Sequence, residues 1–350
     1  EITPGATPRP ISDPKRFNSN SNIGWLRISD VTAQHGRIQH LSQHISILGQ
    51  AKTRVISTPH LLLSIAASVG YPVINYVKTG VHDGFLIFEN PKFNIDFGFY
   101  WLAFYKHEWQ KFGQPGSQVN LNSSIVKKTN IGLPDNVEQK AIVHLLKLID
   151  NCITLQQRKL KDIQLLKKAY LKAIFKSNKS TYKLKDIADY RRGSFPQPYG
   201  NPKWYGGDGS LPFVQVIDVA KNLRLYNSTK QRISRLAQSK SVFVPKGSIL
   251  ITLQGSIGKV AITQYDAFVD RTLLIISNLK KDVDKYYFAY ALQDKFNEEK
   301  RKAPGGTIKT ITKNALSEFQ IKLPKKDIQK KQSSILQKID KDIYIINLKS

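Results

Sequence analysis

The stretch closest to a known chemical motif is residues 255–259, Gly-Ser-Ile-Gly-Lys, which ends like a loop that binds nucleotide phosphates. Such a loop needs four residues between its first glycine and the Gly-Lys pair, and a Ser or Thr after the lysine to bind magnesium. Here two residues separate the glycines, and Val260 follows Lys259. We therefore predict that this stretch is a tight turn between two strands.

Two other patterns are equally weak as catalytic or metal sites. Residues 89–93 (Glu-Asn-Pro-Lys-Phe) lack the second proline of an amino-methyltransferase motif, and no glycine-rich loop precedes them. His40 and His44 have helical spacing, but neither Glu nor Cys stands nearby to complete a metal site, so solvated histidines are the better interpretation. We predict a chain without catalytic activity, metal or cofactor. A nuclease or methyltransferase with a degenerate motif is the alternative from another class.

The charge points to a polyanionic partner. The 350 residues include 54 Lys and Arg but only 26 Asp and Glu, a formal charge of +28. Such an excess favours nucleic acid first and an anionic membrane second, against a generally lysine-rich surface. We expect a nucleic-acid partner and no membrane partner, and no run of 18 apolar residues is present to form a transmembrane helix. The single cysteine, Cys152, excludes a disulfide framework and is consistent with the cytoplasm.

Basic residues in the expected loops are the candidates for DNA contact, because base edges are read by Arg, Lys, Asn and Gln, and phosphates by Lys and Arg. In the first half of the chain they are Arg9, Lys15, Arg16, Lys52, Arg54 and Lys78. In the second half they are Arg191, Arg192, Lys203, Arg224, Arg232, Arg235, Arg271 and Lys309, together with Tyr205. For each residue alone, a solvated charge or a phosphate contact is more common than a base contact.

A long helix must position these loops. Residues 135–176 contain neither Gly nor Pro, and their apolar residues recur at steps of three and four. A helix of that length would span about 60 Å and needs a partner helix along its narrow apolar stripe. A single helix crossing a globular core would show a wider apolar face.

The partner helix is expected after Pro324. There Gln332 and Asp340 repeat Gln139 and Asp150 of the first helix, with a spacing that is shorter by three positions. We predict a coiled coil of the two helices. Its contacts would pair Ile149, Ile153, Leu160 and Ile163 with Ile335, Ile339, Ile343 and Ile346.

The two halves of the chain are an internal repeat. Asp218 and Gly258 repeat Asp30 and Gly70 at a constant offset of 188 in the numbering, Pro304 repeats Pro115 at an offset of 189, and Pro324 repeats Pro134 at an offset of 190. The stretches that end at Val31 and Val219 alternate like strands. We predict an α+β fold with a pseudo-two-fold axis: mixed α/β domains at 1–133 and 178–323, and helices at 134–177 and 324–350.

We have two expectations for the ends of the repeat. Nothing in the first half corresponds to residues 182–188, so we expect the first repeat to begin ahead of Glu1. At Ser350 the second helix has reached about half the length of the first. Either the chain continues beyond Ser350 or the full spacer is absent.

This repeated order resembles the specificity subunit of type I restriction–modification systems over essentially all of the chain. The residues that carry the resemblance are Thr-Pro near the opening, 133–150, 212–219, 247–262 and 305–307. The resemblance implies two target recognition domains, each reading one half of a split site in double-stranded DNA, and two antiparallel helices that set their spacing. It also implies a chain without catalytic activity that binds modification subunits, of which we expect two. Restriction subunits would associate with it through the complex. A stand-alone DNA-binding or anti-restriction protein on the same scaffold is the alternative.

Overall fold

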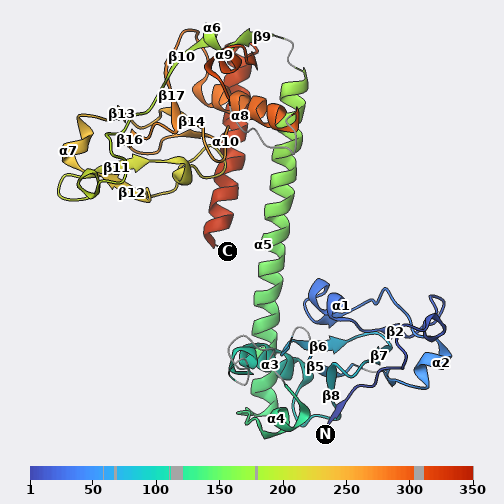
Figure 1. The fold of residues 1–350 in the computed structure, drawn as a ribbon. Helices are drawn as coiled ribbons and strands as arrows, with labels where there is room; N and C mark the ends of the chain where they lie inside the picture. Colours follow the sequence, from blue (N-terminus) through green and yellow to red (C-terminus); the bar gives the residue numbers. More distant parts are fainter. Residues whose placement is uncertain are drawn as a thin grey trace. The chain divides into compact units, whose positions relative to one another are not determined.

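The protein is described by a computed structural model that covers residues 1–350 except 58, 67–68, 110, 112–120, 178–179, 303–310 and 350. The chain divides into two compact units, Glu1–Thr154 and Leu155–Ser350. Each unit mixes helices with antiparallel and parallel strands (Figure 1), as the α+β prediction requires. The long helix α5 (Asn136–Ser177) begins in the first unit and continues into the second.

The first unit contains a five-stranded sheet in the order β1-β8-β5-β6-β3 and a three-stranded sheet in the order β2-β7-β4. Its strands are β1 (Ile2–Pro4), β2 (Gly24–Trp25), β3 (Arg37–Ile38), β4 (Arg54–Ile56), β5 (Leu61–Ser64), β6 (Pro72–Asn75), β7 (Thr79–Val81) and β8 (Phe85–Phe88). Its shorter helices are η1 (Pro14–Arg16), α1 (Ile28–Ala33), α2 (Ile47–Gln50), α3 (Ile95–Trp109) and α4 (Ser123–Lys128). Alternate residues of β5 enter different cores: Leu61 and Leu63 join that of α3, and Leu62 joins that of α1.

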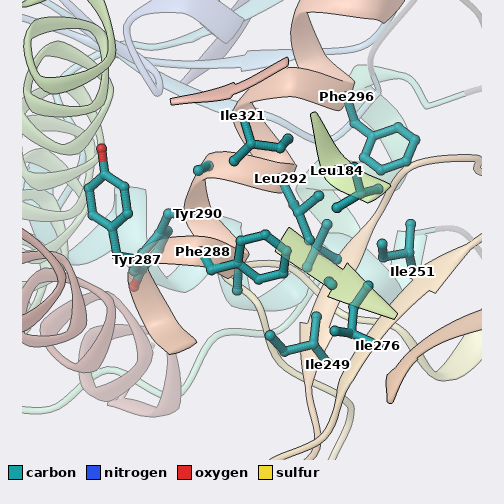
Figure 2. Close-up of a cluster of buried hydrophobic side chains, with 14 of the residues drawn as sticks. Leu184, Ile249, Ile251, Ile276, Tyr287, Phe288, Tyr290, Leu292, Phe296 and Ile321 are labelled. Carbon is teal, nitrogen blue, oxygen red and sulfur yellow. The ribbon is translucent and has the colours of Figure 1, made fainter. Parts of the chain in front are cut away.

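The second unit repeats this plan with sheets ordered β10-β17-β14-β15, β12-β11-β16-β13 and β18-β9. Its strands are β9 (Thr181–Lys183), β10 (Ala188–Arg192), β11 (Leu211–Val214), β12 (Gln231–Ile233), β13 (Val242–Val244), β14 (Ile249–Thr252), β15 (Val260–Ile262), β16 (Ala267–Val269), β17 (Leu273–Leu279) and β18 (Gln320–Lys322). Its helices are α6 (Leu184–Ile187), η3 (Pro202–Trp204), η4 (Val216–Asp218), α7 (Arg235–Gln238), α8 (Lys285–Lys302), α9 (Lys313–Ser317) and α10 (Lys326–Lys349). Ile249 and Ile251 of β14 belong to the same buried cluster as Phe288 of α8, and Figure 2 shows Ile249 beside Phe288.

Strand pairing confirms the internal repeat. Thr3 pairs with Ile87 in the first unit, and Arg191 pairs with Ile275 in the second, with the same offset of 188 for both partners. The predicted turn at residues 255–259 is confirmed between β14 and β15. Its Gly258 has a φ of 79°, and a Cβ there would lie 2.4 Å from the ring of Phe296, so both backbone and packing require glycine. Pro115 and Pro304, two further landmarks, lie outside the described residues.

The strands predicted up to Val31 and Val219 end earlier than expected. The chain leaves β2 after Trp25 and β11 after Val214, then enters a helical turn in each unit. The cause is local capping. The Asp30 carboxylate accepts a hydrogen bond from the Arg27 amide at 3.1 Å, and Asp218 accepts one from the Gln215 amide at 2.7 Å.

A buried glutamine begins each long helix. The Gln139 side chain accepts from the Asn94 amide at 2.9 Å and donates to the Pro134 carbonyl at 2.8 Å. Gln329 makes the same two bonds, to the Asp284 amide at 2.9 Å and to the Pro324 carbonyl at 2.7 Å. The equivalent of Gln139 is therefore Gln329, at the offset of 190 that also relates Pro134 to Pro324. The match with Gln332 was wrong, and the spacing to the aspartate is the same in both helices.

That aspartate joins each long helix to the aromatic helix of its unit. The Tyr100 hydroxyl donates to Asp150 at 2.7 Å, and the Tyr290 hydroxyl donates to Asp340 at 2.6 Å, again with an offset of 190. In the second unit Asp340 also pairs with Lys167 of α5 at 2.5 Å. Burial and the adjacent Asp340 charge raise the pKa of Tyr290, so its hydroxyl stays a donor.

Helix α10 lies antiparallel to the part of α5 within the second unit (Figure 1). Its buried face carries Gln329, Ser333, Leu336, Asp340 and Ile343. At Leu336 and Asp340 this face lies one residue, about 100° of helical rotation, from the predicted Ile335 and Ile339, because α10 also packs on α8. Ile343 belongs to both the predicted stripe and the buried face. Of the eight predicted pairing residues, Ile343 is buried; Leu160, Ile163, Ile339 and Ile346 are half-buried; and Ile149, Ile153 and Ile335 are exposed. The prediction that Ile335 belongs to the buried seam was wrong. Pairing of Ile149 and Ile153 with α10 stays a prediction.

Removal of one partner of the Lys167–Asp340 ion pair should strongly destabilise the second unit. Their side chains are only 13% and 10% exposed. The substitution Lys167→Met leaves a buried carboxylate without its cation and should lower the free energy of unfolding by about 3 kcal/mol. Urea denaturation measures this, with the exposed neighbour Lys168→Met as the control. Equal unfolding midpoints for the two variants would contradict a stabilising pair.

Candidate nucleic-acid interface

Lys15 and Lys203 occupy equivalent positions in the two units, and side-chain hydrogen bonds fix the backbone of each. The Lys15 amide donates to the Asp13 carboxylate at 3.0 Å, and the Lys15 carbonyl accepts from the Ser46 hydroxyl at 2.6 Å. In the second unit the Lys203 amide donates to the Asn201 side chain at 3.2 Å, and its carbonyl accepts from the Ser234 hydroxyl at 2.7 Å. Each backbone is held on both sides while the lysine side chain is exposed, which suits contact with a polyanion.

The side chains around these lysines differ between the units. The short helix beside Lys15 presents Ile47, which is 85% exposed, whereas the equivalent residue beside Lys203 is the exposed cation Arg235. Lys203 and Lys240 both lie over the ring of Trp204, at 4.8 and 5.4 Å from its centroid. The scaffold is thus repeated while the surface it presents is not.

Three predicted contact residues instead hold the loops together. The Arg16 guanidinium donates to the carbonyls of Leu48 and Arg9, both at 3.2 Å, and its side chain is only 14% exposed. Arg232 donates to the hydroxyl and the carbonyl of Ser210 at 3.1 and 2.5 Å. The Tyr205 hydroxyl donates to the Tyr199 carbonyl at 2.8 Å. These residues position the loops, and direct DNA contact by them stays a prediction.

The other predicted residues fall into groups by their surroundings. Arg9 pairs with Asp83 at 3.3 Å, and Arg54 pairs with Glu89 at 3.5 Å. Arg224 lies over the ring of Tyr344 of α10 at 4.6 Å, and Arg271 lies over Tyr199 at 5.7 Å. The remaining candidates are exposed surface cations: Lys52, Lys78, Arg191, Arg192 and Arg235. Lys309 lies outside the described residues.

Local electrostatics set the protonation states of groups beside the candidate residues Arg9 and Arg271. The hydrogen bond from Thr7, followed by that from Arg9, holds the pKa of Asp83 below its usual range, so this carboxylate stays charged and partly neutralises Arg9. Burial lowers the pKa of His82 beside it, which keeps that ring neutral at pH 7. In the second unit burial and Asp270 raise the pKa of Tyr199 to about 12, so its hydroxyl remains a hydrogen-bond donor.

One cation of this surface was missed from the sequence. Lys240 lies beside Trp204 and is the equivalent of the predicted Lys52 at the repeat offset of 188. Applying the repeat offset to each candidate would have found it. Among the described residues, no group of three His, Cys, Asp or Glu side chains could hold a metal ion. In the same described part of the chain, no helix is long and apolar enough to cross a membrane.

The family model of the type I restriction modification DNA specificity domain matches residues 2–165 and again residues 176–350. The chain therefore belongs to this family and carries two such domains.

Two curated relatives come from Methanocaldococcus jannaschii and bear the names of type I restriction enzyme specificity subunits. MjaX is 25% identical over 253 residues, 65% of this chain and 56% of that protein, and MjaIX is 29% identical over 164 residues, 45% and 37%. The chain thus spans about half or less of the length of these relatives.

Two solved structures share the fold. The type I restriction–modification S subunit from M. genitalium aligns with a TM-score of 0.61 at 12% identity, covering 100% of this chain and 89% of that one. A chain from a structure of the type I restriction–modification system aligns with a TM-score of 0.58 at 17% identity, covering 99% and 89%. These matches confirm the repeated fold, and the match to the family model confirms the resemblance.

The role of Arg16 can be separated from that of its exposed neighbour. Arg16→Ala removes two hydrogen bonds from a charged donor to loop carbonyls and should lower the free energy of unfolding by about 2 kcal/mol. Arg9→Ala, at a side chain 80% exposed, should leave it nearly unchanged. Thermal or urea unfolding of both variants measures the difference. An Arg16→Ala protein as stable as Arg9→Ala would refute the loop-holding role.

Proposed function

We propose that this chain is the DNA-binding specificity subunit of a type I restriction–modification complex and reads a bipartite target, one half-site per unit. The observation that carries the proposal is the pair Lys15 and Lys203, held by the same backbone bonds in two units whose surrounding side chains differ. Equivalent scaffolds can approach equivalent features of a duplex, and divergent side chains can then read different bases. The names of the relatives and the family match support the same role.

The proposed partners beyond DNA are two modification subunits docked on the long helices and restriction subunits held through the complex, in the cytoplasm. Support for helix docking comes from large apolar side chains that α5 leaves exposed, among them Leu145, Leu148 and Leu155. An exposed apolar stripe on a helix suits another helix. The chain itself would supply recognition and no catalytic group, in line with its family.

The experiment that tests the proposal is selection of bound sites from a random duplex library. The purified chain is mixed with modification subunits, and bound DNA is sequenced. Two short conserved half-sites with a constant gap between them are expected. Bound DNA without a common sequence would reject the specificity role, and methylation or cleavage by the chain alone would reject the non-catalytic one.

Phosphate contacts should dominate the affinity, because the formal charge is +28. With six to ten neutralised phosphates, the affinity should fall by roughly 10³- to 10⁵-fold between 50 and 200 mM salt. Fluorescence anisotropy of a labelled duplex measures this dependence. An affinity that changes less than about tenfold over that range would exclude binding dominated by phosphates.

Each unit should read its own half-site. Lys203→Ala should lower the discrimination between right and wrong bases at one half-site by about 1–3 kcal/mol, the value of a base contact. The discrimination at the other half-site should stay unchanged. Lys15→Ala is the matched variant in the first unit and should affect the opposite half-site. Competition with duplexes mutated in one half-site at a time makes the measurement. A change at both half-sites after either single substitution would contradict separate reading.

A further inference from the structure

A short helix carries the same five-residue pattern in both units. Residues 46–50 read Ser-Ile-Leu-Gly-Gln, and residues 234–238 read Ser-Arg-Leu-Ala-Gln, at the repeat offset of 188. The first pattern includes α2 and the second includes α7 (Figure 1). Three positions are identical and one keeps a small residue, whereas the remaining position changes from Ile47 to Arg235.

The unchanged positions hold the short helix on its unit. Besides the bonds from the serines to the lysine carbonyls, the Gln50 side chain donates to the Ser21 hydroxyl at 3.3 Å. Gln238 donates to the carbonyl of Gly209, the equivalent of Ser21, at 2.8 Å. Ala237, the small residue of the second helix, is fully buried. The backbone of the short helix is therefore held in the same way in both units.

The side chain at position 47/235 takes no part in this anchoring. Ile47 is 85% exposed, more than any other large apolar side chain among the described residues. Arg235 is exposed as well, and no carboxylate in the described part of the chain pairs with its guanidinium. A Cβ placed on Gly209 would lie 3.6 Å from the Arg235 Cδ, so the stem of this arginine passes beside a residue without a side chain. Both side chains are open to a partner outside the unit.

The short helix lies directly beside an exposed lysine in each unit. The Ser46 hydroxyl binds the Lys15 carbonyl, and the Ser234 hydroxyl binds that of Lys203. Once such a lysine contacts DNA, whether at a phosphate or at a base edge, the short helix is brought to the same groove. Position 47/235 would then meet the base edges.

A residue that makes two half-sites differ must itself differ between the units. Leu48 and Leu236, the next residues along the helix, are 51% and 59% exposed and offer both half-sites the same apolar contact. Ile47 and Arg235 offer different contacts. In the major groove an apolar side chain contacts the C5-methyl group of thymine, whereas arginine donates two hydrogen bonds to O6 and N7 of guanine.

We propose that position 47/235 selects one base in each half-site. Ile47 contacts the methyl group of a thymine in the half-site of the first unit, and Arg235 binds a guanine in the half-site of the second. The inference rests on the proposed function and deepens it, because it assigns the base chemistry of one residue on each reading surface.

The first test exchanges the two side chains and repeats the selection from a random duplex library with modification subunits present. The Ile47→Arg complex should select guanine where the unsubstituted complex selects thymine, and its second half-site should stay the same. Arg235→Ile should replace guanine by thymine in the second half-site alone. The control Ala33→Arg adds the same charge to the first unit at an exposed residue of α1 and should leave both half-sites unchanged.

The second test changes single atoms of the DNA. Uracil in place of the assigned thymine lacks only the methyl group and should weaken binding of the unsubstituted complex by about fourfold. Binding of the Ile47→Ala complex should not weaken further. In the other half-site 7-deazaguanine lacks the N7 acceptor and should weaken binding by about tenfold or more, but not for Arg235→Ala.

The outcomes separate this inference from the proposed function. Two half-sites that neither exchange alters would overturn the inference and leave the proposed function standing. An Arg235→Ile complex that binds every sequence equally more weakly would also overturn it, because phosphate contacts act in that way. A complex that selects no common sequence would overturn both. Uracil decides even where a variant loses its half-site, since equal binding of the thymine and uracil duplexes by the unsubstituted complex would refute the role of Ile47.

Discussion

The buried polar attachment at the start of each long helix is the constraint on which the rest depends. A glutamine side chain closes the helix entry, and one aspartate about three turns later binds a tyrosine of the aromatic helix. Unpaired buried polar groups are costly, so the bonds of the buried Gln139 and Gln329 and the buried Tyr290–Asp340 bond set the rotation and axial position of each helix on its unit. The equivalent Tyr100–Asp150 bond is exposed. The seam of α10 follows from this attachment rather than from the isoleucine stripe alone.

Hydrogen bonds to the backbone fix the repeated scaffold, whereas the outward side chains on its surface are not fixed by them. Backbone bonds to Ser46 and Ser234 hold equivalent turns, and these bonds tolerate any outward side chain at the neighbouring positions. Ile47 and Arg235 can therefore differ freely at equivalent places. A protein that reads two unlike half-sites with one fold requires this separation of scaffold from reading surface.

The repeat, the long helices and the turn at Gly258 could be predicted from the sequence, because glycine, proline and helical periodicity have local physical causes. The match of Gln329 with Gln139 could not be predicted, since Gln332 lies close by in the same helix and only the tertiary hydrogen bonds distinguish the two glutamines. Ile335 was placed in the seam because an apolar stripe does not reveal which neighbour it meets. From the sequence, Arg16 and Arg232 looked like free cations, although each donates a hydrogen bond to a backbone carbonyl far along the chain.

Helix α5 is proposed to set the distance between two separate readers. Insertion of one heptad between Thr154 and Leu155 would leave the internal contacts of both units intact, rotate the helix by only about 20°, and lengthen it by about 10 Å. That length equals roughly three base pairs at about 3.4 Å each. Sites selected by the complex with this variant should keep both half-site sequences, and the gap between them should grow by about three base pairs. An unchanged gap in a stably folded variant would show that α5 is not the spacer.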